Sequence, residues 1–287
     1  MTSYIKNYYK IIKPGIIRGN LMNATAGYLF AAAGNIRPGL YVATMSGLAM
    51  IIASGCVFNN FIDRDIDKKM ARTKNRATVT GQISGQAAIA GATILGLAGT
   101  LIMFVFSNFQ SMILALFGLF MYVIVYGIAK RRTVHGTVIG SISGAIPPVV
   151  GYSAAAGSLN LGAGLLFLIY VFWQMPHFYA ISIYRKKDYA AAKIPVISIV
   201  KGNRTAKIHM LAYTIAFTLV AALLSIIGPA GNTFLLVSII VGAIWFWRGF
   251  QAIENNNDSK WAGKMFGFSL IVILLVDITL SLNHWLP

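Results

Sequence analysis

Residues 39–76 read GLYVATMSGLAMIIASGCVFNNFIDRDIDKKMARTKNR, and the two parts of this stretch differ sharply. Residues 39–62 carry no charge, whereas residues 63–76 hold three aspartates and six lysines or arginines. An apolar helix needs about 20 residues to cross the hydrocarbon of a bilayer. The stretch therefore predicts a membrane-spanning helix over 39–61 that leads into a charged loop at the membrane surface.

The rest of the chain has the same apolar character. Of its 287 residues, 57% are hydrophobic and 11% are charged, and the mean hydropathy is +0.70. Soluble domains average roughly 25% charged residues. The composition predicts an all-α integral membrane protein with a single domain over 1–287. Nine apolar runs are long enough to span a bilayer: 16–34, 39–61, 86–106, 109–128, 137–156, 162–184, 208–228, 232–250 and 265–284.

Lysine and arginine are distributed unevenly between the connections. The N-terminal segment and the connections after the second, fourth, sixth and eighth runs hold 23 of the 24 Lys and Arg residues, and Arg37 is the other. Because cytoplasmic loops collect these residues, we expect a cytoplasmic N-terminus, an external C-terminus and a location in the cytoplasmic membrane of a bacterium. The net charge of +17 then belongs to these loops, so no nucleic-acid partner is expected.

Acidic side chains gather at the end of the second run. Asn59, Asp63 and Asp67 are spaced by four residues, which places them along one helix face, here called the polar row. Asp65 points elsewhere. Stacked carboxylates repel one another, so something must offset their charge. Basic neighbours in a solvated loop are one answer. The other is Mg²⁺, a hard cation that takes one or two carboxylates together with phosphate oxygens.

The residues that follow the polar row favour the second answer. Arg72 and Arg76 lie in a run of basic residues, and guanidinium groups suit phosphate oxygens. An acidic row followed by a basic run is the pattern expected for a magnesium-diphosphate site. We therefore predict Asn59, Asp63 and Asp67 as metal ligands.

A second charged cluster follows the sixth run. Tyr184, Lys187 and Asp188 lie there, with Tyr184 and Asp188 four residues apart. Four runs separate Asp63 from Asp188, so both clusters emerge on the same side of the membrane. A lone aspartate among basic residues is usually a neutralised surface group. Its position on the same side as the polar row raises the alternative that the two clusters hold one substrate between them.

Two further ionisable residues lie within predicted spans. His177 follows Pro176 about two turns from the cytoplasmic end of the sixth run, and Asp277 lies in the last run. Ionisable groups inside a membrane are costly and mark candidate functional sites. For His177 the alternative is a neutral ring that hydrogen-bonds to a carbonyl freed by the proline. For Asp277 we expect an internal hydrogen bond.

Four blocks of sequence resemble the UbiA superfamily of membrane prenyltransferases, and its heme-farnesylating branch in particular. The first aspartate-rich motif indicates the superfamily alone, whereas the WQMPH sequence and the KDYAAAKIP sequence point to the branch. The blocks are KPGIIRGN (13–20), SGCVFNNFIDRDIDKKMARTKNR (54–76), GSISGAIPPVVGY (140–152) and FWQMPHFYAISIYRKKDYAAAKIPV (172–196).

The resemblance implies a helical bundle with a central cavity. It implies transfer of a farnesyl group from farnesyl diphosphate to a vinyl group of heme B, giving heme O, with Mg²⁺ as cofactor and terminal oxidase assembly proteins as partners. Asp63, Asp67, His177 and Asp188 would be catalytic. The residues that would bind substrate are Asn59, Arg72, Arg76, Tyr184 and Lys187. Tyr184 stands where the second superfamily motif has a carboxylate, so that loop would bind diphosphate directly.

Two other functions fit parts of the sequence. A prenyltransferase for a quinone precursor would share the polar row, and only the block at 172–196 argues against it. A membrane transporter could use His177 and Asp277, since carriers often place charged sites near the membrane midplane. Most acidic groups here lie at the cytoplasmic ends of the runs instead, which favours a site near the surface.

Overall fold

A computed structural model describes residues 3–251, 253 and 258–287, and this part of the chain is helical, without strands. The helices, in chain order, are α1 (Ser3–Ile11), α2 (Pro14–Ala32), α3 (Pro38–Ile62), α4 (Arg64–Asp67), α5 (Gly85–Phe106), α6 (Phe109–Phe120), the π-helix η1 (Met121–Val125), α7 (Tyr126–Arg132), α8 (Gly136–Gly144), α9 (Ile146–Ala156), α10 (Leu161–Tyr184), α11 (Lys186–Ala191), α12 (Ile197–Val200), α13 (Gly202–Ile226), α14 (Asn232–Phe250) and α15 (Asp258–Ser281).

Eight helical segments among the described residues are long and apolar enough to cross a membrane. They correspond to the second to ninth predicted runs, and the integral membrane class is confirmed. The first run forms α2, which has 19 residues but includes Arg18, Asn20 and Asn23 and is less apolar than the others. The predicted count of nine spans is therefore not reached by apolar length alone.

Two of the spans are built from more than one helix. The fourth runs through α6, η1 and α7 without a break. The fifth divides into α8 and α9 at Ala145, just before Pro147 and Pro148. A proline lacks an N–H donor and clashes with the preceding turn, so paired prolines end one helix and begin the next. Pro176, in contrast, lies inside the single helix α10.

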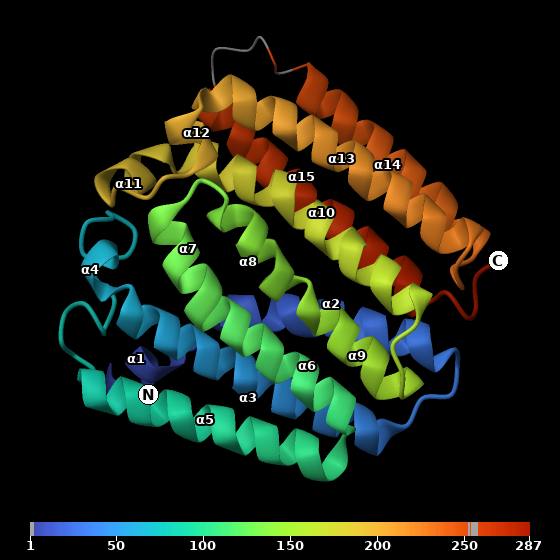
Figure 1. The fold of residues 1–287 in the computed structure, drawn as a ribbon, viewed down its shortest axis with the longest axis horizontal. Helices are drawn as coiled ribbons and strands as arrows, with labels where there is room; N and C mark the ends of the chain where they lie inside the picture. The colour runs from blue at the N-terminus through green and yellow to red at the C-terminus, as the bar shows by residue number, and fades with distance from the viewer. Residues whose placement is uncertain (1–2, 252, 254–257) are drawn as a thin grey trace.

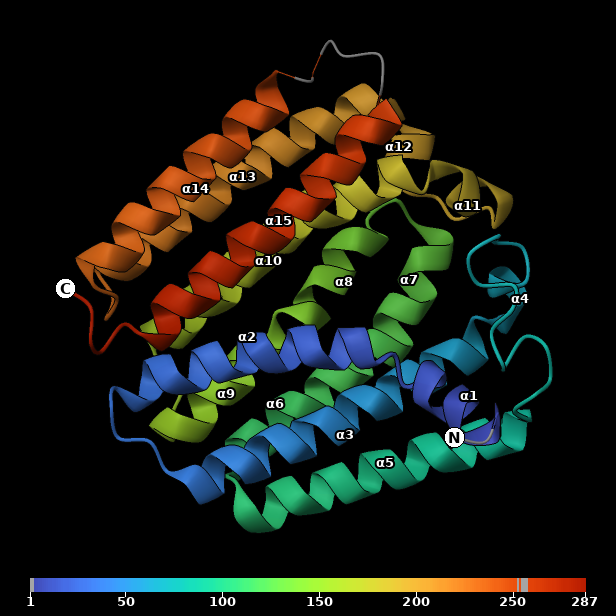
Figure 2. The same cartoon turned by 180° about the vertical axis from the view of Figure 1, so that it is seen from behind.

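The helices pack as a bundle around two main apolar cores. One core joins α10, α13, α14 and α15, and the other joins α2, α3, α6 and α9. Figures 1 and 2 show α3 beside α5, and α10 packs against both α13 and α15. Helices α2 and α9 approach closely at glycines: a Cβ on Gly151 would lie 1.9 Å from the Ala24 carbonyl oxygen. Small residues at such crossings are typical of membrane helices.

The charged segments lie at one end of the bundle. Helices α4 and α11 and the connection from α7 to α8 share that end, as both views show (Figures 1 and 2). Isoleucine, leucine and phenylalanine side chains of α5 and α6 point away from the core and are exposed on the outer surface of the bundle. A bilayer covers such a surface without cost, because lipid tails are as apolar as these side chains. The fold therefore presents its polar chemistry at one end.

Candidate active site

The two charged loops predicted to face one another do meet. The backbone N–H of Ala71 donates a hydrogen bond to Oδ1 of Asp188 at 3.2 Å. Beside this contact, Ile66 and Met70 pack against Ala192 and Ile194 in a small buried cluster. The loop after α4 is thus joined to α11 by both polar and apolar contacts (Figure 1).

The polar row keeps helical spacing although α3 ends at Ile62. The Asp63 N–H donates to the Asn59 carbonyl at 2.9 Å, and the Asp67 N–H donates to the Asp63 carbonyl at 2.8 Å. These bonds carry the i to i−4 pattern across the junction between α3 and α4. Asn59, Asp63 and Asp67 are 6%, 6% and 4% exposed. The side chain of Asp65 is 58% exposed, so it faces away from the buried row.

Each member of the polar row has a basic partner. Lys130 of α7 forms an ion pair with Asp63, and Arg131 Nη2 lies 3.2 Å from the same carboxylate. Arg76 Nη1 lies 2.5 Å from Asp67 Oδ2. A buried carboxylate without a partner is strongly destabilising. These cations therefore balance the charge of the two buried carboxylates.

The pKa values of two ionisable groups outside the spans, Lys13 and Asp65, are shifted by their surroundings. Lys13 Nζ donates to Asn59 Oδ1 at 3.0 Å, and burial lowers the pKa of this lysine to about 8. The hydrogen bonds from Arg131 lower the pKa of Asp65. The first shift disfavours a charged form and the second favours one. Basic side chains thus lie around the two buried carboxylates.

The row offers the ligands that Mg²⁺ prefers, which are two carboxylates and an amide oxygen. No group of three His, Cys, Asp or Glu side chains comes together to bind a metal within the described ranges. A metal held by Asp63 and Asp67 would need further oxygen ligands. Phosphate oxygens of a substrate supply such ligands, so the residues fit a magnesium-diphosphate site.

The remaining predicted diphosphate residues lie further out. Arg72 and Lys187 are exposed at the rim of the two loops. Tyr184 is 41% exposed, with the Arg185 guanidinium carbon 4.5 Å from the centre of its ring. The Tyr184 ring also lies beside Gly263 of α15. Asp188 of the second loop, in contrast, accepts a hydrogen bond from the Ala71 N–H in the loop that follows the polar row.

His177 belongs to the contact between α10 and α15. Its Nδ1 lies 2.7 Å from Ser269 Oγ, and its ring stacks on Trp173 with centroids 5.0 Å apart. The Trp173 indole N–H donates to the Ser269 carbonyl at 2.8 Å. Phe266 lies on another side of the ring, at 4.9 Å. The hydrogen-bond partner of the imidazole is therefore a side chain of α15 rather than a carbonyl freed by Pro176.

A pocket lies beside the Lys130–Asp63 pair, between α7, α8, α10 and the loop after α11. Its lining combines Lys130, Tyr126 and Tyr189 with the apolar side chains of Phe178 and Pro195. One wall is thus charged and next to the polar row, and the other is apolar and comes from α10 and the segment after α11. An amphiphile with an anionic head and an apolar body has this distribution of chemistry.

Comparison with known proteins identifies the family. A family model described as the UbiA prenyltransferase family matches residues 20–271. This chain belongs to the UbiA prenyltransferase family. Among UbiA proteins, the protoheme IX farnesyltransferase of Protochlamydia amoebophila is 46% identical over 278 residues, which are 96% of this chain and 98% of that protein. The protoheme IX farnesyltransferase of Edwardsiella ictaluri is also 46% identical, over 97% of this chain and 95% of that protein.

Solved UbiA structures share the fold. A chain from a study of digeranylgeranylglyceryl phosphate synthase has a TM-score of 0.81 at 17% identity, with 99% of both chains covered. A UbiA homologue from Archaeoglobus fulgidus, bound to DMAPP and Mg²⁺, has a TM-score of 0.69 at 14% identity, covering 93% of this chain and 99% of that one. These likenesses extend over the whole bundle and confirm the expected UbiA-type architecture.

Membership of the UbiA family makes this chain a prenyltransferase and rules out the transporter interpretation. Asp277, on which that interpretation relied, is buried and accepts a hydrogen bond from the Tyr170 hydroxyl, as expected for an internal partner. The pair links α10 to α15. Its role is to hold two helices of a UbiA bundle together.

Sequence reasoning missed three cations of this UbiA site. Lys13, Lys130 and Arg131 entered the analysis only as loop charges, whereas Lys130 is 9% exposed and paired with Asp63. For Lys13, the only local signal in the sequence is its position directly before Pro14. In the structure it adopts φ 54°, a left-handed conformation that is uncommon outside glycine. For Lys130, the signal is its place directly after an apolar run, where a side chain can turn back toward the bundle.

Proposed function

We propose that this chain transfers the farnesyl group of farnesyl diphosphate to a vinyl group of heme B, giving heme O and diphosphate. The observation that carries the proposal is the 46% identity to protoheme IX farnesyltransferases over nearly the full length of both chains. The polar row of two buried carboxylates, joined to a second charged loop, supplies a place for the diphosphate.

The reaction begins at the bond between farnesyl C1 and the diphosphate oxygen. This bond breaks with its electron pair leaving on the diphosphate, so negative charge grows there in the transition state. Mg²⁺, when bound by Asn59, Asp63 and Asp67, would neutralise part of that charge. Arg76 and Lys130 lie beside the row and are already oriented toward its carboxylates. Preorganised cations at this position stabilise the leaving group.

The allylic cation must then react with the heme vinyl group before water can react with it. The electrons of the heme vinyl group form the new carbon–carbon bond to C1, and the cation passes to the adjacent heme carbon. Water adds there and loses a proton, which gives the hydroxyethyl group. Apolar side chains such as Phe178 and Pro195 line the pocket next to Lys130 and exclude bulk water from the first step.

His177 is assigned to the heme side of the reaction. Its imidazole is held by Ser269 and by stacking on Trp173, which leaves the ring with a defined orientation. Such a ring can orient heme or accept the proton released after water addition. Asp188, Lys187 and Tyr184 belong to the second loop, and we assign them to diphosphate binding at the rim.

The same proposal includes the location of the enzyme. We place it in the cytoplasmic membrane with α4 and α11 at the cytoplasmic face, because the basic loops lie at that end. Heme O leaves into the same bilayer, where proteins that assemble terminal oxidases would receive it.

The test is an assay of the purified protein with heme B, farnesyl diphosphate and Mg²⁺. The expected result is heme carrying a farnesyl and a hydroxyl group, seen by mass spectrometry, and loss of this product when the metal is chelated. An aromatic quinone precursor is the comparison acceptor. Prenylation of that acceptor without modification of heme would contradict the proposal.

A further inference from the structure

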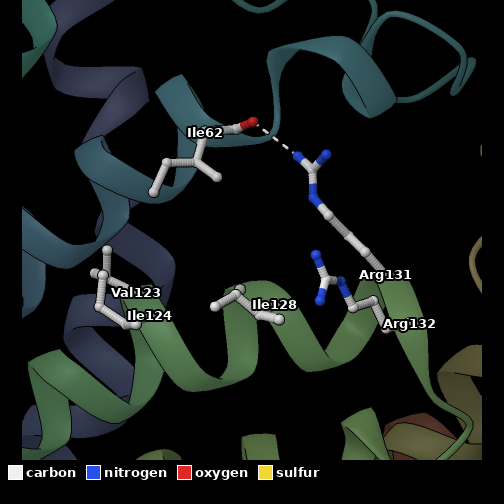
Figure 3. A pocket seen from close by; sticks show the side chains of 7 residues that line it. Ile62, Val123, Ile124, Ile128, Arg131 and Arg132 are labelled. Atoms are coloured by element: carbon white, nitrogen blue, oxygen red, sulfur yellow. Dashed lines mark hydrogen bonds between the residues drawn. The ribbon is translucent and has the colours of Figure 1, made fainter.

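A second pocket lies on the outside of the bundle, away from the chamber beside Lys130. Its apolar lining comes from Ile62 at the end of α3 and from Val123, Ile124 and Ile128 along η1 and α7, with Gly127 between them (Figure 3). Ile62, Ile124 and Ile128 are 36%, 46% and 51% exposed. These side chains belong to spanning segments, so the pocket opens toward the hydrocarbon of the bilayer.

Two arginines close the polar end of this pocket. Arg131 bonds to the Ile62 carbonyl at 2.7 Å and to Asp63 and Asp65, so its charge is already balanced. The Nε of Arg131 is buried without a hydrogen-bond partner among the described residues. Arg132 is exposed, and no hydrogen bond or ion pair involves it within the part of the chain that the structure describes. One cation therefore stands free at the head of an apolar groove.

The backbone at the pocket is also irregular. Val123 and Ile124 belong to the π-helix η1, none of whose residues is buried. Single π-helical turns inside α-helices occur often at functional sites. Beside them, Gly127 leaves open space: a Cβ at this position would meet no atom within 4 Å. The wider turn and the missing side chain together hollow the surface of the helix at membrane depth.

We propose that this groove binds one anionic phospholipid of the surrounding bilayer. The headgroup phosphate would lie against the exposed guanidinium of Arg132, and an acyl chain would lie along Ile124, Gly127 and Ile128. Basic pockets next to membrane helices bind anionic lipid headgroups. A phosphodiester carries a single negative charge, which matches the one free cation, whereas a prenyl diphosphate carries more charge than this site balances.

The test uses the full-length protein purified in neutral detergent and titrated with phosphatidylglycerol or phosphatidylcholine, with bound lipid counted by native mass spectrometry. We expect one tightly bound phosphatidylglycerol and little phosphatidylcholine. Arg132→Gln should weaken phosphatidylglycerol binding about ten-fold, as expected for one charge-assisted hydrogen bond. Gly127→Leu adds a side chain at the groove, where its Cβ meets no atom within 4 Å, and should weaken binding while every cation remains.

The matched control is Arg204→Gln, which removes an exposed arginine at the same end of the bundle on α13. It should leave binding unchanged. Equal losses in Arg132→Gln and Arg204→Gln would reduce the effect to bulk charge and overturn the site. Unchanged binding in both Arg132→Gln and Gly127→Leu would also overturn it. Displacement of the bound lipid by stoichiometric farnesyl diphosphate would show a substrate site in place of a lipid site.

Discussion

Lys130 of α7 forms a buried ion pair with Asp63, at the end of α3, across the wall of the pocket that we assign to the reaction. The two residues are 67 positions apart in the sequence. The pair fixes α7 against the polar row before any substrate arrives. A metal ion held by Asp63 would take over the charge balance of this carboxylate, and the Lys130 ammonium group would then be placed to contact the diphosphate.

Removing the lysine should therefore lower stability as well as turnover. Lys130→Met leaves Asp63 with Arg131 alone, and breaking a buried ion pair costs about 3–5 kcal/mol. We expect a lower melting temperature in metal-free protein, partly restored by Mg²⁺ with farnesyl diphosphate, because the metal replaces the lost positive charge. A melting temperature equal to that of the wild type would contradict the pairing.

The two arginines predicted to bind diphosphate should differ in sensitivity. Arg76 lies against Asp67 and is partly buried, whereas Arg72 is exposed. Lysine keeps the charge but loses the planar fork. Losing one charge-assisted hydrogen bond corresponds to about ten- to hundred-fold in rate. Arg76→Lys should lose that much in kcat, and Arg72→Lys less. Steady-state kinetics decides, and a larger loss at Arg72 would reverse the assignment.

The heme-side role of His177 can be separated from a packing role. His177→Ala should weaken heme binding while leaving farnesyl diphosphate binding intact. Ser269→Ala should have a smaller effect in the same direction, because it removes only the partner that orients the ring. The measurement is the affinity for each ligand together with the melting temperature. Early melting with equal loss of both ligands would leave His177 a structural role only.

The predicted orientation in the membrane rests on the distribution of lysine and arginine among the loops. Cys56 is buried, so a single added cysteine can report accessibility to a membrane-impermeant thiol reagent. Lys74→Cys, in the loop after α4, should react only from the cytoplasmic side, and a cysteine added after Pro287 only from outside. Labelling of both positions from one side would overturn the predicted orientation.

Local patterns predicted most of the fold. Runs such as 86–106 and 232–250 are uniformly apolar, and length alone identifies them as spans, here α5 and α14. Apolar length alone does not show the division of the fifth span at Ala145, and the signal for it is the pair Pro147 and Pro148 within that run. The lower apolarity of α2 was also missed: Asn23 is buried in the bundle, whereas Arg18 is exposed.

The site was only partly predictable, because some of its contacts are local in the sequence and others join distant segments. The spacing of Asn59, Asp63 and Asp67 is local, so the buried row could be expected from helix geometry alone. Three of its cations, Lys13, Lys130 and Arg131, come from distant segments, and pairing across such distances leaves no periodic signal. Tyr184 shows the converse. Its spacing from Asp188 suggested a shared face, but α10 ends at Tyr184 and the chain turns into α11 before Asp188.

The central claim is that the polar row binds the metal-diphosphate group, and comparing three aspartates in the heme farnesylation assay tests it most directly. Asp63 and Asp67 are buried in the row, whereas Asp65 is exposed and bound to Arg131. Asp63→Asn and Asp67→Asn should each lower kcat by about a hundred-fold or more, as expected when a preorganised charge is removed. Asp65→Asn should retain most activity. Equal losses at all three positions, with the proteins still folded in the membrane, would contradict the account.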